Sequence, residues 1–179
     1  MGKKFNMHKF IERMALRNAV NASLQRIAIY GPTATPANKR AYRETLKTWL
    51  KQLALRYYTW EYDGAKYCAE IVALKTHLNA THGPILAKMT IGICQKPITL
   101  WLKYLWLNGD CSKKPIFATL DRGIMQTANV QNPPNWPDID TLDEYKRIVD
   151  HIDSLASTKG FGCGAVWEAE TWSDESEDE

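Results

Sequence analysis

Apolar residues recur at steps of three and four positions along most of this chain, which is the spacing of an amphipathic α-helix. The spacing is clearest in four stretches, residues 7–30, 36–58, 66–78 and 141–156. No stretch of convincing length alternates apolar and polar positions, as a half-buried strand would. The pattern therefore predicts an all-α fold of about six helices, in which any hairpin is peripheral.

Residues 96–107 differ from the other predicted helices because apolar side chains surround this helix on nearly every side. A helix of that kind is buried, so we expect it at the centre of the fold. The five residues ahead of it, Ile91–Gln95, contain Gly92 and are predicted to form a hairpin. Shorter helices are expected over residues 84–90, 116–128 and 165–172.

Capping signals mark the beginning of two helices. Thr35 followed by Pro36 provides an N-cap and a first-turn proline. Thr141-Leu-Asp-Glu144 is a capping box, in which the hydroxyl and the carboxylate each satisfy a backbone N–H group of the first turn. We therefore expect helices to begin directly after Thr35 and Thr141.

The length of 179 residues is that of one ordinary domain. We expect a single compact helical domain over residues 1–172, followed by a disordered acidic tail over residues 173–179 that is poor in apolar side chains. No run of 18 apolar residues is present, and no apolar signal-peptide core follows the charged N-terminus. We therefore expect a cytoplasmic protein with no membrane partner.

Charge is strongly segregated along the chain, although the formal net charge is only +3. Residues 1–60 carry 12 lysines and arginines against two acids, residues 61–167 are balanced, and the last 12 residues carry seven acids and no base. A basic segment of this kind predicts a polyanionic partner, and we expect nucleic acid, DNA more than RNA. The bases expected to contact phosphate are Lys39, Arg40, Arg43, Lys47, Lys113 and Lys114.

Simpler interpretations of this charge pattern stay open. The bases of the first two helices could form an ordinary solvated face. The acidic tail either competes with a polyanion for these bases or only aids solubility.

The familiar sequence motifs of phosphate-binding, hydrolytic and metal-dependent enzymes are absent. The four cysteines form no Cys-x-x-Cys pair, so we expect them to be reduced. His77 and His82 lie near one predicted helix end, but no third ligand accompanies them. We therefore predict no metal and no cofactor.

The segment around Gly92 and Lys96 resembles the helix-hairpin-helix element of DNA glycosylases. In that superfamily a glycine-containing hairpin presents backbone N–H groups to a DNA phosphate, and in some members a lysine that begins the second helix attacks the sugar. Gly92 lies four residues before Lys96, and Phe117-Ala-Thr-Leu-Asp121 is similar to the family motif that ends in an aspartate. Cys94 stands where the family has its second hairpin glycine, and the Lys96 to Asp121 separation of 25 exceeds the family's usual spacing.

This resemblance, which covers residues 89–130, implies a DNA-binding protein with glycosylase-like or base-modifying activity. It implies that Lys96 and Asp121 are catalytic, and it places Gly92 and Gln95 of the hairpin against DNA. A desolvated lysine is nucleophilic near neutral pH, and a carboxylate across the cleft can move protons and stabilise an oxocarbenium-like sugar. The candidates for stacking on a flipped base are Trp60, Tyr62 and Trp136.

A structural interpretation of the same two residues makes Lys96 a solvated lysine and Asp121 an N-cap or an ion-pair partner. The segment QKxxxLxLKYLW, which begins at Gln95, is also similar to uncharacterised proteins, some from phages or mobile elements. The alternative function is therefore a non-catalytic phage or mobile-element protein, in the host cytoplasm, that binds a host defence component or nucleic-acid complex. Catalysis requires Lys96 and Asp121 in one concave pocket, whereas a docking surface would leave both exposed.

Overall fold

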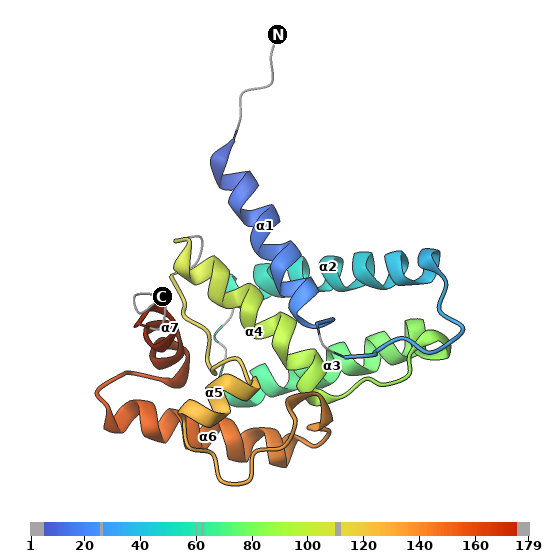
Figure 1. The fold of residues 1–179 in the computed structure, drawn as a ribbon. Coiled ribbons are helices and arrows are strands. Elements are labelled where there is room, and N and C mark those ends of the chain that lie inside the picture. Colours follow the sequence, from blue (N-terminus) through green and yellow to red (C-terminus); the bar gives the residue numbers. More distant parts are fainter. Residues whose placement is uncertain (1–5, 26, 60, 62, 110–111, 175–179) are drawn as a thin grey trace.

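The computed structural model describes residues 6–25, 27–59, 61, 63–109 and 112–174 (Figure 1). Over these residues the fold consists of seven α-helices, and the sole β-contact is an isolated bridge between Tyr30 and Leu86. The prediction of an all-α fold is therefore confirmed. The helices are α1 (Met7–Ala22), α2 (Pro36–Thr59), α3 (Gly64–His82), α4 (Ile91–Leu107), α5 (Arg122–Thr127), α6 (Leu142–Thr158) and α7 (Gly164–Asp174), with single 3-10 turns η1 (Gly83–Ile85) and η2 (Trp136–Asp138).

Helix α4 runs through the middle of the molecule and packs against α1, α2, α3 and α6 (Figure 1). Its apolar side chains, among them Ile98, Trp101 and Leu102, are buried. The indole N–H of Trp101 also donates a hydrogen bond of 2.9 Å to the carbonyl of Leu50 in α2. The predicted position of this helix at the centre of the core is confirmed.

The predicted hairpin at Ile91–Gln95 is wrong, because these residues form the first turns of α4. Thr90 is the N-cap of the helix, and its hydroxyl oxygen accepts a hydrogen bond of 3.2 Å from the Ile93 N–H. Gly92 is buried in the first turn, where its N–H donates to the Ile139 carbonyl at 2.9 Å. This N–H group is therefore already bonded within the protein and does not face a phosphate, so the helix-hairpin-helix prediction is not supported.

The chain after α1 also departs from the predicted pattern, because α1 ends at Ala22 rather than continuing to residue 30. The next segment pairs with the segment after η1. The Gly31 N–H donates to the Ile85 carbonyl at 2.9 Å, and the Ala87 N–H donates to the Ile29 carbonyl at 2.8 Å. Because these segments satisfy each other's backbone groups, the short helix expected before α4 is reduced to the single turn η1.

The helix predicted over residues 116–128 is shorter than expected, since only α5 is helical. The residues ahead of α5 run alongside α4 instead, where the buried side chain of Gln95 holds them. Its amide Nε2 donates to the Leu120 carbonyl at 2.9 Å, and its Oε1 accepts from the Leu120 N–H at 3.2 Å. A side chain of the central helix therefore replaces the backbone partners that a helix would have provided.

Helices α2, α3 and α6 lie where the pattern predicts them, and their caps explain their first residues. The Thr35 hydroxyl accepts from the Asn38 N–H at 3.2 Å, and the Thr141 hydroxyl accepts from the Glu144 N–H at 3.2 Å. Helix α7 continues to Asp174, so the first two residues of the predicted acidic tail are helical. Residues 175–179 of that tail lie outside the described residues.

Candidate functional site

One face of α4 lines a cavity of about 350 Å³, which we call the site cavity. The positions on this face lie near multiples of one helical turn apart and are Lys96, Leu100, Lys103, Tyr104 and Leu107. The remaining lining residues are Gln25 after α1, Thr119 and Asp121 ahead of α5, and Glu168 and Ala169 of α7. The cavity thus has an apolar part and a charged part, and its size is that of small-molecule sites.

The two residues predicted to be catalytic, Lys96 and Asp121, come together in the site cavity. The Lys96 Nζ lies 3.7 Å from the Asp121 Oδ2, and the two side chains are 13% and 23% exposed. The same Nζ lies 4.4 Å from the ring centroid of Trp136, which is a cation–π distance. Both side chains of the ion pair are therefore mostly buried but open to the cavity, and they do not lie on a flat surface.

Asp121 also has a structural role, because it is the N-cap of α5. Its Oδ1 accepts a hydrogen bond of 3.0 Å from the Ile124 N–H, while its Oδ2 faces Lys96. The N-cap and the ion pair, which the structural interpretation offered as alternatives for this residue, therefore both form, one on each carboxylate oxygen.

A second ion pair, which sequence reasoning missed, lies deeper in the site cavity. The Lys103 Nζ lies 2.5 Å from the Glu168 Oε1, and the two side chains are 9% and 2% exposed. Glu168 also accepts a hydrogen bond of 2.8 Å from the Thr119 N–H through its Oε2. This pair fastens α7 to α4 and to the segment ahead of α5.

Burial dominates the electrostatics of Glu168. Desolvation raises the pKa of its carboxyl, and the nearby charge of Asp121 raises it further, whereas Lys103 and the Thr119 N–H lower it. Asp121 is the smallest of these influences, so the carboxyl of Glu168 responds mainly to its burial and to Lys103. A perturbed pKa of this kind occurs at functional sites and also in structural ion pairs.

A sequence signal for this pair exists. Lys103 lies within the most apolar helix, and a lysine at such a position needs a partner because a lone buried charge is strongly unfavourable. Glu168 likewise directly follows an apolar stretch, Gly164–Trp167. The pairing itself spans 65 positions of the chain, so the spacing of residues does not reveal it.

Two of the predicted nucleic-acid contacts and one predicted stacking residue are buried. Gln95 is fully buried and bonded to Leu120, and Gly92 lies under η2. Trp136 is 8% exposed, and the ammonium of Lys96 lies over its ring. The interpretation of these three residues as a DNA-facing surface is therefore corrected, and the other stacking candidates, Trp60 and Tyr62, lie outside the described residues.

Four of the predicted phosphate contacts lie on α2. Lys39, Arg40 and Arg43 are exposed, and Lys47 is half-buried in an ion pair of 2.8 Å with Glu44. Arg43 also donates to the Asn21 side chain at 3.1 Å, which joins the α2 surface to the end of α1. These bases lie on the first half of α2, at the opposite end of the molecule from α7 (Figure 1).

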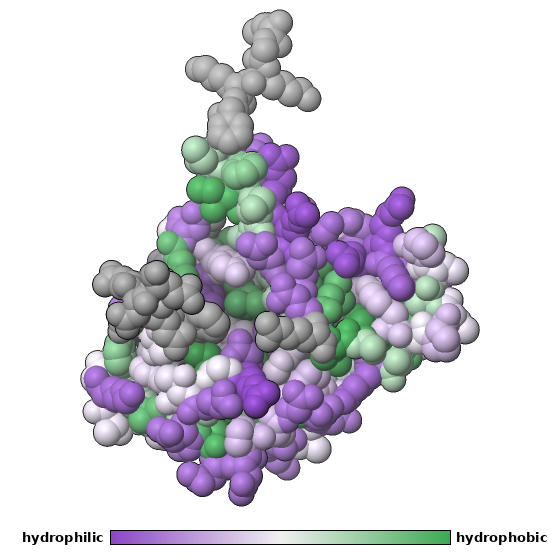
Figure 2. Space-filling model, in the orientation of Figure 1, coloured by the Kyte–Doolittle hydropathy of each residue, from purple (hydrophilic) through white to green (hydrophobic). Residues whose placement is uncertain are grey.

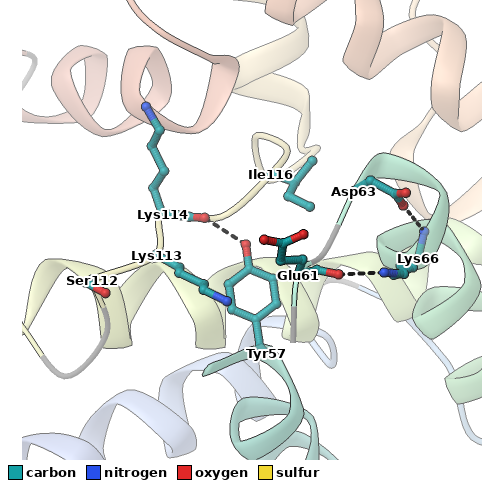
Figure 3. A pocket seen from close by; sticks show the side chains of 8 residues that line it. All are labelled: Tyr57, Glu61, Asp63, Lys66, Ser112, Lys113, Lys114 and Ile116. Carbon is teal, nitrogen blue, oxygen red and sulfur yellow. Dashed lines mark hydrogen bonds between the residues drawn. The ribbon is translucent and has the colours of Figure 1, made fainter. Parts of the chain in front are cut away.

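The other two predicted phosphate contacts border a second cavity, of about 560 Å³. Figure 3 shows the Lys113 side chain pointing toward Tyr57 in this cavity and the Lys114 side chain pointing away from it. The Lys114 carbonyl accepts a hydrogen bond of 2.7 Å from the Tyr57 hydroxyl. The cavity is also lined by Glu61 and Asp63, so it lacks the uniformly basic lining that a phosphate site would need.

The histidines and cysteines have identifiable surroundings in the described part of the chain. The ring of His77 stacks on Trp49 at 5.0 Å between centroids. Cys68 and Cys94 are buried thiols without a disulfide. Among the described residues, no group of three or more histidine, cysteine, aspartate or glutamate side chains could hold a metal ion.

In the part of the chain that the structure describes, no helix is both long and apolar enough to cross a membrane.

A comparison of this chain with models of protein families, with curated proteins and with solved structures finds no match.

Proposed function

We propose that this protein binds nucleic acid, DNA in preference to RNA, through the exposed bases of α2 and acts on a base-bearing unit in the site cavity. The observation that supports the proposed chemistry is that the Lys96 Nζ lies 3.7 Å from the Asp121 Oδ2, and that both side chains line the site cavity. This is the concave arrangement that catalysis requires. The proposed activity is glycosylase-like or base-modifying.

The ion pair assigns different roles to its two members. As the partner of a carboxylate, Lys96 is an ammonium, which has no lone pair for attack on a sugar. The Asp121 carboxylate can take a proton from a water molecule as the water oxygen bonds to the sugar C1′. The C1′–N bond breaks as the C1′–O bond forms, its electron pair leaves with the base, and the Lys96 ammonium supplies the proton that the leaving base needs.

Substitutions at Asp121 separate this chemistry from its capping role. Asparagine caps a helix as well as aspartate does, so Asp121→Asn keeps the bond to the Ile124 N–H and removes only the charge. We expect it to lower the rate of base release or modification by about 10²- to 10⁴-fold, the range for loss of a general base. The measurement is mass spectrometry of products from a panel of DNAs with modified bases.

The Lys75–Asp140 pair, an ion pair outside the site cavity, provides a matched control. Asp140→Asn removes the same charge and should leave the rate unchanged. Trapping with borohydride distinguishes an amine attack by Lys96 from the water mechanism, since only the amine forms a reducible bond to the sugar. Full activity in the Lys96→Ala, Asp121→Asn double variant, or no activity of the unaltered protein on any DNA in the panel, would contradict the catalytic proposal.

Binding to nucleic acid is tested separately. Lysine and arginine contacts to phosphate release counterions, so affinity should fall steeply with salt, by roughly 0.9 logarithmic units per contact for each tenfold rise. The Lys39→Glu, Arg40→Glu, Arg43→Glu variant should bind duplex DNA more weakly and with a shallower salt dependence. A matched variant with the same charge change on and after α6, Lys146→Glu, Arg147→Glu, Lys159→Glu, should bind like the unaltered protein. Equal affinities of both variants would remove the α2 surface from the proposal.

A further inference from the structure

The first half of α1 projects from the body of the protein, whereas its second half packs on α4 (Figure 1). The side chains that α1 buries all lie in the second half and are Ala15, Leu16, Ala19 and Val20. The projecting half carries large apolar side chains that are 38% to 60% exposed, namely Met7, Phe10, Ile11 and Met14. A soluble helix does not need this many exposed apolar residues within two turns.

These exposed residues form one stripe. Met7, Phe10, Ile11 and Met14 are spaced as positions i, i+3, i+4 and i+7, which share one face of a helix. At 3.6 residues per turn, this face points roughly away from the face that packs on α4. Figure 2 shows the same division, with hydrophobic surface on one side of the projecting half of α1 and hydrophilic surface on the other.

A row of bases lies along one flank of the apolar stripe. Lys9, Arg13 and Arg17 are exposed and spaced four residues apart, so they follow one edge of the helix. The other flank carries His8, and the only acid of the helix, Glu12, lies on the face opposite the stripe. The helix therefore has an apolar face with a basic edge on one side and not on the other.

We propose that α1 docks in an apolar groove with an acidic rim on a partner protein. Helices that bind in this way insert anchors at i, i+3, i+4 and i+7 into a groove, which is the spacing of the exposed stripe. The row from Lys9 to Arg17 fits acidic side chains on one rim, and such charge complementarity fixes orientation and speeds association. This inference is independent of the site cavity and of the α2 surface.

Two other occupants fit the helix less well. A helix that lies on an anionic membrane typically carries bases on both flanks of its apolar stripe, whereas the bases of α1 follow one flank only. In an antiparallel pair with a second copy of this chain, the two rows of bases would face each other and repel.

Calcium-loaded calmodulin is a suitable probe, because it presents a methionine-rich apolar groove among acidic residues and takes basic amphipathic helices. We expect the full-length protein to bind it in a titration calorimeter with a one-to-one stoichiometry. The Ile11→Ser, Met14→Ser variant should bind at least about tenfold more weakly, since two anchors are lost. Lys9→Glu, Arg13→Glu should weaken binding and reduce its salt dependence.

The exposed apolar residues Leu55 of α2 and Val72 of α3 provide a matched control. The Leu55→Ser, Val72→Ser variant should bind calmodulin like the unaltered protein. No binding of the unaltered protein, or an equal loss in the control, would overturn the proposal. Two further results would overturn it if calmodulin does not bind. One is binding to phosphatidylglycerol vesicles that the Ile11→Ser, Met14→Ser variant loses, and the other is self-association in the ultracentrifuge that this variant loses. DNA binding and activity should be unchanged in the Ile11→Ser, Met14→Ser variant, so failure here is distinguishable from failure of the proposed function.

Discussion

Gly92 lies where the first turn of α4 closely approaches the turn η2. A Cβ atom at this position would lie 1.8 Å from the Trp136 carbonyl oxygen, which no real contact allows. The missing side chain also lets the Gly92 N–H reach the Ile139 carbonyl. The glycine is therefore required by a close approach of two backbone segments rather than by the hairpin that its sequence surroundings predict.

We expect Gly92→Ala to destabilise the protein by about 1–3 kcal/mol or more, because an inserted methyl group must push η2 away from α4. Denaturant unfolding followed by circular dichroism measures this as a lower midpoint. Gly83→Ala is the matched control, since Gly83 has helical dihedral angles and nothing lies within 4 Å of its Cβ position. That variant should be neutral or slightly stabilised, and equal midpoints for the two variants would contradict this account.

The beginning of α4 shows why the boundaries of elements are harder to predict than the elements themselves. Pro97 favours a helix that starts beside it, because proline has no N–H and fits a first turn. In the structure Pro97 lies inside α4, and the helix starts six residues earlier at Ile91, directly after the Thr90 cap. Burial of Ile91, Ile93 and Cys94 on the central helix outweighs the backbone bond that Pro97 cannot make.

A titratable side chain, His82, joins the end of α3 to α2, because its Nε2 lies 2.9 Å from the Thr45 hydroxyl oxygen. Burial lowers the pKa of His82, and the neighbouring His77 lowers it further. The unfolded chain then binds this proton more tightly, so the associated stability is present above the unfolded pKa and is lost as pH falls through the folded value.

We therefore expect the denaturant concentration at the unfolding midpoint to decrease as the pH is lowered from about 7.5 to about 5.5, a range that spans the ordinary histidine pKa. His82→Gln can still bond to Thr45 but does not titrate, so it should reduce this pH dependence. His8→Gln changes an exposed histidine and should leave the dependence as it is. An identical pH dependence in the two variants would show that His82 does not cause it.

Across the whole molecule, charge occupies two distinct settings. The bases of the first 60 residues that the structure describes lie mostly on the surfaces of α1 and α2, where water screens them. Lys96 and Lys103 instead lie on the central helix and are paired with acids from later in the chain. The net charge of the site cavity is therefore balanced, and its polarity comes from local ion pairs rather than from the basic segment.

The candidate site was predictable in part. The resemblance points to Lys96 and Asp121, and the structure brings the two together although the hairpin of the resemblance does not form. The resemblance does not point to Lys103 and Glu168, although a lysine in an apolar helix signals a buried partner. Gln95 was expected to face DNA and instead holds Leu120, because a polar side chain on a buried helix must bond to whatever packs against it.

Residues close together in the sequence account for the all-α class, the positions of α2, α3 and α6, and the burial of α4 at the centre of the fold. These features follow from periodicity and capping, which depend on residues within one or two turns of each other. Contacts between distant parts of the chain account for the helical state of residues 91–95, the non-helical chain ahead of α5, and the pairing of Glu168 with Lys103. Each of these depends on burial or on bonds between residues far apart in the chain, whose energies local patterns do not contain.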